Sequence, residues 1–419
     1  MCPAENNLTI DPRFIATLPD DDPLFIAEFD PLLAQNFEKP QLMRRLGLIL
    51  ENLDGFDDLE NRFVVRGVPH TLALGTSLLT SPAEGGDGTT TPPDQRTGWS
   101  GDGAPGSGTL REFAIGAVRQ HFTKSLSPTP GIDFRFPTEA ELDDLEAFQL
   151  SLGREEDPDL ALIVPRDPIA ERGRTLFLAV DTAGGTVRAG KCQLCHENGG
   201  AALGGAPGGF NFNFNTGVEA LIDRPAQVVD PENDPPDGGF GVAPFPATPG
   251  AFGDGTFNTP PLVEAADTPP FFHDHSVGSL EGAIAFYNSA AFAASPAGVT
   301  MAGLDSAGIG IVLEATEIEE VAAFMRVLNV LENVRVARAA SAAALATPSR
   351  REAKAQVAAA IPEVTDAIEV LSEGRLHPEV VNELGCVLRD LNKSLKHPRG
   401  ATLLGLLERL DGLVGVLVE

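Results

Sequence analysis

Residues 192–196 form a C-x-x-C-H motif, which constrains this chain more than any other feature of its sequence. Cys192 and Cys195 are three positions apart, so one helical turn places both sulfurs on the same side, and His196 follows directly. This spacing lets both thiols form thioether bonds to the vinyl groups of a haem while the imidazole reaches the iron. Histidine is also the usual proximal ligand of haem iron. The motif therefore predicts one covalent haem c held by Cys192, Cys195 and His196.

The same letters also fit a coincidental pattern, a redox-active cysteine pair or half of a zinc site. A structural zinc site needs about four N or S ligands, and the other two cysteines, Cys2 and Cys386, stand alone in the sequence. Upstream, the pattern Gly-x-x-Leu-Phe at 173–177 predicts a short helix that packs closely against another helix near the haem. The motif and this helix together favour haem over zinc.

Length and charge narrow the class of protein further. At 419 residues the chain exceeds one ordinary domain, and two or three are expected. Its 30 basic and 60 acidic residues give a net charge of −30, which argues against nucleic acid as a partner, since phosphates are also negative. The charge fits either solubility or the steering of a basic redox partner to an acidic face. No apolar run approaches the roughly 18 residues of a membrane span.

The first seven residues, MCPAENN, are polar and do not form the apolar core of a secretion signal. Haem c is attached outside the cytoplasm, so we expect a periplasmic or exported protein whose leader is absent from this chain.

The pattern along the chain predicts a mainly α fold. Apolar periodicity indicates helices at 40–53, 110–123, 137–152, 279–288 and 317–340, and Thr138 with Glu141 forms a capping-box pattern. A stretch rich in Gly, Pro, Asn and Asp at 196–257 is expected to be a long functional loop around a haem edge. Residues 341–419 alternate helical runs with breaks at Pro348, Pro362, Pro378 and Pro398.

Two parts of the chain repeat an order of features, which suggests two haem-type domains. The segments 68–72, 99–103 and 110–121 correspond to 259–262, 272–276 and 280–287, and this alignment places His121 opposite Tyr287. We therefore expect two cytochrome c-like helical domains with long Gly/Pro-rich loops. They are an N-terminal domain at 1–160 without an attachment motif and a haem domain at 166–338, followed by a helical appendix at 341–419.

The second half resembles the C-terminal haem domain of bacterial di-haem cytochrome c peroxidases and MauG-like enzymes. FNTPPL at 257–262 and TPPFFHD at 268–274 carry the resemblance together with 173–196. It extends over about residues 60–335 and is most specific around 173–196 and 257–288.

The resemblance implies roles for particular residues. Tyr287, the only tyrosine, stands where MauG-like proteins have a tyrosine iron ligand and the peroxidases a methionine. Trp99, the only tryptophan, matches the tryptophan that relays electrons between the haems. Thr268 and Pro270 match backbone ligands of an inter-haem calcium ion. His121 is the candidate distal residue of the first domain.

Two departures from the family pattern bear on activity. The chain lacks a first C-x-x-C-H, although residues 2–6 resemble the residues directly after such a motif in relatives, so we expect a truncation within the first haem site. The helix that carries the peroxidatic glutamate in the family has no glutamate after Glu112, and Thr123 stands near that position.

The expected function is electron transfer, with peroxide reduction or oxidation of a partner as a further activity. A non-enzymatic electron-transfer cytochrome is the alternative, and a haem-free binding module is a third. The expected partner is a small basic cytochrome or cupredoxin.

Several of these residues also have ordinary structural interpretations. His70, His121, His273 and His275 fit turn or surface roles, and His273 and His275 also fit contacts to a haem propionate. Tyr287 fits a buried aromatic with its hydroxyl paired. If Tyr287 is not the ligand, Met301 and Met325 are the competing soft donors and His275 is a further alternative, although Met325 also fits an apolar helix face.

Overall fold

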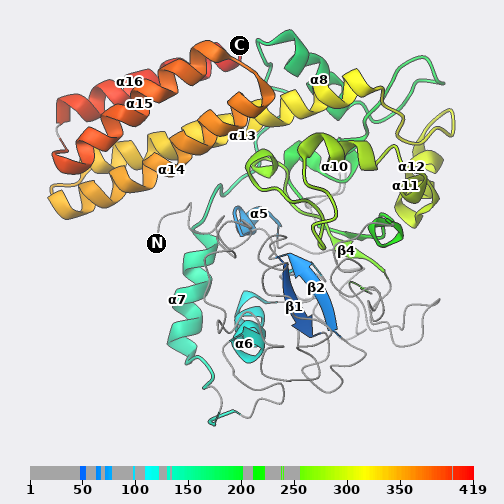
Figure 1. The fold of residues 1–419 in the computed structure, drawn as a ribbon, viewed down its shortest axis with the longest axis horizontal. Coiled ribbons are helices and arrows are strands. Elements are labelled where there is room, and N and C mark those ends of the chain that lie inside the picture. The colour runs from blue at the N-terminus through cyan, green and yellow to red at the C-terminus, as the bar shows by residue number, and fades with distance from the viewer. Residues whose placement is uncertain are drawn as a thin grey trace.

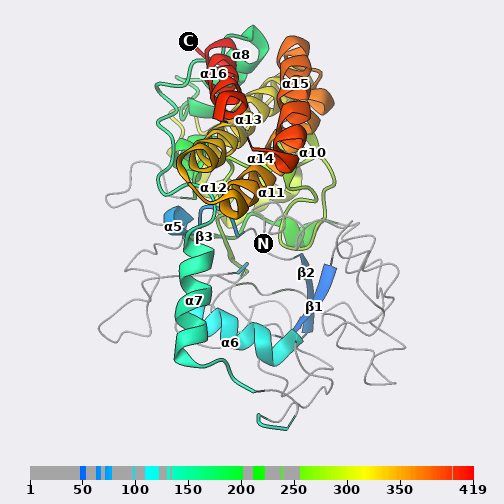
Figure 2. The same cartoon turned by 90° about the vertical axis from the view of Figure 1, so that its left-hand side faces the viewer.

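The computed structural model describes residues 48–52, 63–67, 71–77, 98–99, 109–121, 130–132, 135–201, 211–221, 237, 239, 255–398 and 400–419, with the backbone alone at 48–52, 63–65, 112 and 119–121. This part of the chain is mainly helical with a few short strands, as the sequence predicts. Most of the helices lie together on one side, and the strands β1 and β2 lie with helices α6 and α7 on the other (Figures 1 and 2).

A long helix, α13, is the spine of the larger part (Figure 1). Four helices pack along it or along each other: α8 (Pro168–Leu178), α14 (Arg350–Gly374), α15 (Pro378–Lys396) and α16 (Gly400–Leu417). Their buried side chains form one continuous hydrophobic core from Leu160 to Leu417. Each fully buried Val or Leu in it contributes about 1.5–3 kcal/mol to folding, so the bundle is a large share of the stability.

Helix α13 (Ala315–Ala346) passes without a break through residue 341. The predicted boundary between the domain at 166–338 and the appendix at 341–419 thus falls inside one helix. The C-terminus also returns to the start of the haem-motif region, because the Glu419 N–H donates to the Val164 carbonyl at 3.0 Å and Arg166 N–H to the Leu417 carbonyl at 2.9 Å. The C-terminal helices therefore share their core with the segment that carries the motif.

Helix α8 begins and packs for reasons visible in its sequence. The Asp167 side chain caps the helix by accepting from the Ile169 and Ala170 N–H groups, and Pro168 occupies the first turn. Gly173 faces α13 so closely that a Cβ there would lie 1.8 Å from the Glu320 carbonyl oxygen. The close helix packing expected from the pattern at 173–177 is therefore confirmed.

The smaller part contains the predicted helices α6 (Leu110–His121) and α7 (Glu139–Leu150). Thr138 and Glu141 form the predicted capping box, with the Thr138 N–H donating to Glu141 Oε2 at 2.9 Å. The prediction of a helix at 40–53 is wrong for its end, because β1 (Leu48–Asn52) pairs antiparallel with β2 (Phe63–Gly67). A short apolar run is compatible with a helix and with a strand. Here the run pairs with β2, whose valines and phenylalanine favour strands.

The break predicted at Pro362 is also wrong, since α14 continues through it. Proline removes one backbone hydrogen bond from a helix. Packing compensates here, because Val357, Ala360 and Val364 of the same helix are almost fully buried in the shared core.

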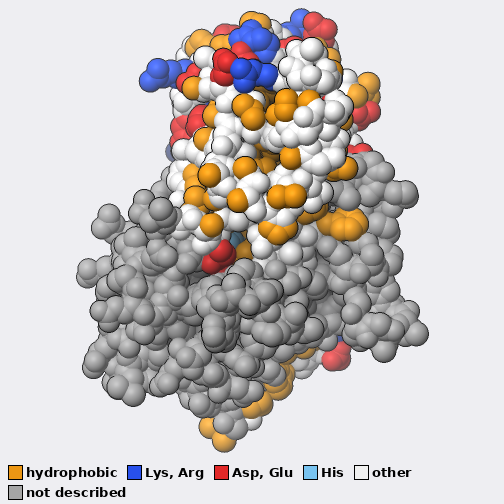
Figure 3. Space-filling model, turned by 90° about the vertical axis from the view of Figure 1, so that its right-hand side faces the viewer, with side chains coloured by type: hydrophobic (Ala, Val, Ile, Leu, Met, Phe, Trp, Pro, Cys, Tyr) orange, Lys and Arg blue, Asp and Glu red, His pale blue; other side chains and the backbone are white. Residues whose placement is uncertain are grey.

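Short elements complete the description: α5 (Leu74–Ser77), α10 (Leu280–Phe286), α11 (Ala290–Ala294), α12 (Pro296–Leu304), β3 (Asn213–Phe214), β4 (Phe257–Asn258), η2 (Cys192–Leu194), η3 (Glu197–Gly199), η4 (Val218–Ala220) and η5 (Ala265–Asp267). The side of the molecule that carries α11 and α12 exposes many hydrophobic side chains, with charges gathered at one end (Figure 3). Val299 and Leu304 of α12 are 61% and 62% exposed. No helix within the described ranges is long and apolar enough to cross a membrane.

Candidate functional site

The C-x-x-C-H segment forms a tight turn that follows α8 after the connection at 179–191. Lys191 adopts a left-handed conformation with φ of 59°, and η2 starts at Cys192. The Cys195 and His196 N–H groups both donate to the Cys192 carbonyl, at 3.2 and 2.9 Å. This turn places the two sulfurs and the imidazole on one short arc of backbone.

Both cysteines are free thiols in this arrangement. Burial raises the pKa of Cys192 and of Cys195 to about 12, so both are protonated at neutral pH. Protonated, buried thiols are poor nucleophiles for disulfide exchange. The pair is thus not organised as a thiolate redox centre.

His196 is 9% exposed and held by backbone carbonyls. Its Nδ1 lies 3.0 Å from the Pro260 oxygen and 3.3 Å from the Gly200 oxygen. A carbonyl only accepts hydrogen bonds, so Nδ1 carries the proton and the lone pair is on Nε2. Burial lowers the pKa of His196 to about 4, which keeps the ring neutral. A neutral imidazole whose Nδ1–H is held by a carbonyl is the usual state of a metal-ligating histidine.

One large apolar cavity joins the predicted site residues. It contains about 1290 Å³ of atom-free space, part of it open to solvent, and its lining includes Trp99, Cys192, Cys195, His196 and Tyr287. Most of the remaining lining is hydrophobic, including Phe177, Phe214, Phe257, Leu262, Phe271, Phe272, Leu280, Ile284, Phe292, Ile311, Leu313 and Val321. The structure therefore brings five of the eight predicted site residues to one cavity.

Tyr287 caps the C-terminal end of α10, on the segment that the repeat predicts. Its ring packs edge-on against Phe286 and Phe292, with centroids 5.4 and 4.9 Å away. Burial, and then the nearby thiols Cys195 and Cys192, raise the pKa of the Tyr287 hydroxyl well above its usual range. The phenol is therefore neutral at pH 7 unless a cation binds it.

The two competing soft donors reach the same cavity. Met301 of α12 and Met325 of α13 both line it, and each is 4% exposed. His275 is not part of the lining, and its ring packs against Gly67, where a Cβ would lie 1.8 Å from His275 Nε2. Tyr287, Met301 and Met325 thus line the same cavity as His196.

Trp99 stands at the boundary between the two parts of the molecule. Its Nε1–H donates to the Gly67 carbonyl at 2.8 Å, and its own carbonyl accepts from the Asn258 N–H at 2.9 Å. The edge of its ring faces His273, with centroids 6.5 Å apart. Trp99 therefore links β2 of the smaller part to β4 and the cavity.

The other predicted residues lie away from these contacts or outside the described residues. His121 ends α6, and its side chain is outside the described residues, as are His70 and Thr123. Thr268 follows η5, and its hydroxyl donates to the Ala265 carbonyl at 3.3 Å, while Pro270 lies in the turn beyond. The calcium site at Thr268 and Pro270 stays a prediction.

Sequence reasoning missed a set of buried ion pairs around the cavity. Lys191 pairs with Asp305 at 2.8 Å, and both side chains are 0% exposed. Arg66 binds both carboxylate oxygens of Asp237 at 2.6 Å. No local pattern signals these pairs, because their partners are 114 and 171 positions apart in the sequence.

His273, interpreted from sequence as a turn residue, also takes part in a buried pair, with Glu219. Its Nε2 lies 2.8 Å from Glu219 Oε1 of η4, and its ring stacks on Phe257 with centroids 3.7 Å apart. Burial lowers the pKa of His273, but the negative charges of Asp274 and Glu219 outweigh it, so the pKa is raised overall. Glu219 was missed because it lies in the 196–257 stretch.

Comparisons with family models, with curated proteins and with the solved structures found no match to this chain.

Proposed function

We propose that this chain is a c-type haem redox protein. The observation that carries the proposal is that Cys192, Cys195 and His196 line the same apolar cavity as Tyr287, although Tyr287 is 91 positions away from His196 in the sequence. The C-x-x-C-H motif alone is only five residues long, so it also fits a coincidental pattern. The position of the motif in the lining of a largely apolar, aromatic cavity supports the haem interpretation over a chance pattern.

The residues that line the cavity fit a haem. The cavity is concave and mostly apolar, with a few polar groups in its lining, which is the usual character of a cofactor site. Its aromatic and aliphatic lining suits a flat apolar macrocycle, and the neutral His196 has its Nε2 lone pair available. The thiols are protonated and unpaired, as the addition of a thiol to a vinyl group requires.

Each residue then has a defined task. Cys192 and Cys195 would hold the haem through thioether bonds, His196 would be the proximal ligand and Tyr287 the sixth. When bound, haem supplies one-electron redox chemistry. The apolar lining excludes water, and Trp99, held at Nε1 and at its carbonyl, is the candidate electron relay between the two parts.

We place the chain in the di-haem peroxidase and MauG-like superfamily, as two cytochrome c-like domains of which only the second keeps its attachment motif. Its activity is electron transfer in the periplasm or outside the cell, with peroxide reduction or oxidation of a partner as a further activity. The net charge of −30 supports a small basic cytochrome or cupredoxin as partner. Calcium at Thr268 and Pro270 belongs to the same proposal.

The experiment is expression behind a secretion leader in cells with haem c maturation machinery. Intact mass and a pyridine haemochrome spectrum should report one haem per chain. The Cys192→Ala, Cys195→Ala double variant should carry none, whereas Cys386→Ala, which changes a cysteine of the C-terminal bundle, should keep the full load. Free thiols and no haem in the wild-type protein would refute the proposal.

A peroxide assay separates the enzyme from the carrier. We expect low turnover from this chain, because it lacks a first attachment motif and the family's peroxidatic glutamate. Rapid reduction by a small partner without peroxide turnover would support the plain electron-transfer cytochrome.

A further inference from the structure

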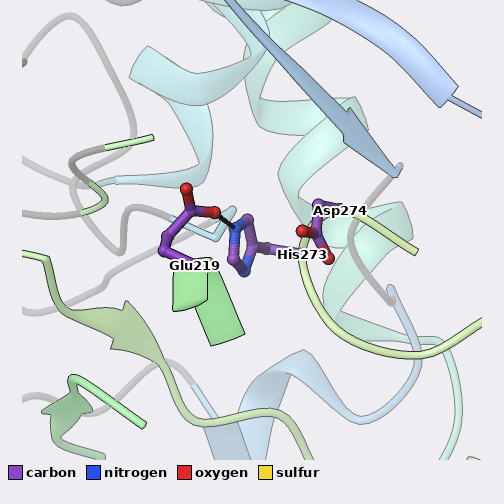
Figure 4. Close-up of side chains that lie close together, drawn as sticks. All are labelled: Glu219, His273 and Asp274. Carbon is purple, nitrogen blue, oxygen red and sulfur yellow. Dashed lines mark hydrogen bonds and ion pairs between the residues drawn. The ribbon is translucent and has the colours of Figure 1, made fainter. Parts of the chain in front are cut away.

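Glu219, His273 and Asp274 form a compact group of N and O donors beside the cavity. Glu219 rises from η4 toward the imidazole, and Asp274 follows His273 along the turn (Figure 4). One ligand atom of each lies within 4.8 Å of the other two. His273 and Asp274 are each 2% exposed, and the Glu219 side chain is 17% exposed. Within the described ranges, no other set of His, Cys, Asp and Glu side chains is arranged to hold a metal ion.

Asp274 has an oxygen that the protein leaves without a donor. Its Oδ1 accepts from the Ser276 N–H at 3.1 Å and from the Ser276 hydroxyl. Its Oδ2 is buried and has no hydrogen-bond partner. An unpaired buried carboxyl oxygen costs free energy, so a cation or donor beyond the described residues would stabilise this atom.

The donor atoms of the group suit a divalent cation. The nearby Asp237 is engaged at both oxygens by Arg66, and its N–H donates to Glu219 Oε2 at 3.3 Å. Glu219 Oε1 faces His273 Nε2, and the buried Asp274 Oδ2 is positioned beside them. One imidazole nitrogen and carboxylate oxygens are ligands that divalent metal ions take in proteins.

We propose that Glu219, His273 and Asp274 bind one divalent transition-metal ion, and Zn²⁺ is the ion used to test the site. One imidazole and two carboxylates suit zinc, whereas calcium prefers oxygen ligands alone. This site is distinct from the calcium site predicted at Thr268 and Pro270, and it does not depend on the haem.

The spacing allows such an ion with little movement. His273 Nε2 and Glu219 Oε1 are 2.8 Å apart, so an ion about 2.1 Å from each subtends a near-right angle. Ligand atoms of a tetrahedral ion lie about 3.4 Å apart. Because the three ligand atoms lie within 4.8 Å of one another, side-chain shifts of up to about 1.4 Å bring them onto one ion, and water completes the coordination.

The test is zinc titration of the full-length protein after metal removal, followed by calorimetry and by elemental analysis of the desalted protein. It is run on haem-loaded protein and on the Cys192→Ser, Cys195→Ser double variant, because free thiols also bind zinc. We expect one saturable zinc ion per chain in both. His273→Gln and Asp274→Asn should each weaken binding at least 10-fold, and excess Ca²⁺ should not displace the zinc.

His377→Gln is the matched control. His377 is also buried and also contacts a glutamate, with Nδ1 3.1 Å from Glu379 Oε1, but it belongs to no group with metal-ligand spacing among the described residues. It should leave zinc affinity unchanged. Zinc should raise the melting temperature of the wild-type protein and not that of Asp274→Asn, whose fold is checked by circular dichroism.

Two results would overturn the proposal. One is zinc binding that disappears when the two cysteines are replaced, which would assign the ion to the thiols. The other is wild-type affinity in both His273→Gln and Asp274→Asn. Haem attachment is measured separately by mass, so failure of the zinc site and failure of the haem proposal are distinguishable.

Discussion

Gly173 of α8 lies against Glu320 of α13 at a distance that no other residue allows. A Cβ on Gly173 would lie 1.8 Å from the Glu320 carbonyl oxygen and 2.8 Å from the Val321 nitrogen. Both atoms are backbone, so no side-chain rotation relieves the contact. Val321 and Phe177 of the same two helices line the cavity. The contact at Gly173 therefore sets the distance between two helices that line the site.

Gly173→Ala should destabilise the protein. Alanine gains up to about 1 kcal/mol of helix propensity over glycine, but separating two packed helices costs about 1–3 kcal/mol or more. We expect a net loss of about 1–3 kcal/mol in the free energy of unfolding, measured by urea titration. Gly405→Ala in α16, where a Cβ meets nothing within 4 Å, should be neutral or stabilising; equal effects of the two changes would contradict this view.

Lys191→Met should be among the most destabilising single changes near the motif. It leaves Asp305 as a buried, unpaired carboxylate, and breaking a buried ion pair at one partner costs about 3–5 kcal/mol. Thermal unfolding of the variant checks the magnitude. Because the uncompensated charge causes the loss, the Lys191→Met, Asp305→Asn double variant should recover part of it. A double variant less stable than the single one would show that the pair acts differently.

Tyr287→Phe should open the sixth coordination position of the haem-loaded protein to water or a small ligand. A phenolate is a hard anionic donor that favours ferric iron, whereas a thioether raises the reduction potential. Tyr287→Met should therefore raise the midpoint potential and produce a low-spin spectrum. Optical spectra and a potentiometric titration measure both. An unchanged ferric spectrum and potential in Tyr287→Phe would make Tyr287 a core aromatic and move the search to Met301 and Met325.

Three buried carboxyl groups should make the protein lose stability as pH rises from about 5 to about 8, most clearly above about 6.5, where the lowered pKa of His196 no longer opposes the trend. Burial raises the pKa of Glu264 and of Glu363 to about 8, and that of Asp267 to about 6. The ordinary values are near 4, so in this window the folded state binds more protons than the unfolded state and stability falls with increasing pH. Each group contributes a slope of at most about 1.4 kcal/mol per pH unit.

Glu363→Gln isolates one of these groups. Glutamine cannot ionise, so the variant should unfold with a shallower dependence on pH and gain stability relative to the wild-type protein at pH 8. Glu408→Gln, a change of an exposed glutamate in α16, is the control. Parallel pH profiles of wild-type protein and Glu363→Gln would contradict the prediction.

Local patterns in the sequence were sufficient for several of the helices and for the turn that carries the C-x-x-C-H motif. The capping box at Thr138 and Glu141, the close-packing glycine at 173 and the C-x-x-C-H turn depend on residues within a few positions of each other. Such short-range features act through backbone geometry that neighbouring residues determine. The same patterns misjudged 48–52 and Pro362, where a partner strand and a packed helix face outweighed local preference.

Only the tertiary structure decided which distant charges meet. Lys191 with Asp305, Arg66 with Asp237 and Glu219 with His273 are separated by 54 to 171 positions. No spacing rule connects such partners, since their contact depends on the path of the whole chain. A buried charge nevertheless requires a partner, so the fold that buries these groups must also bring together the residues that neutralise them.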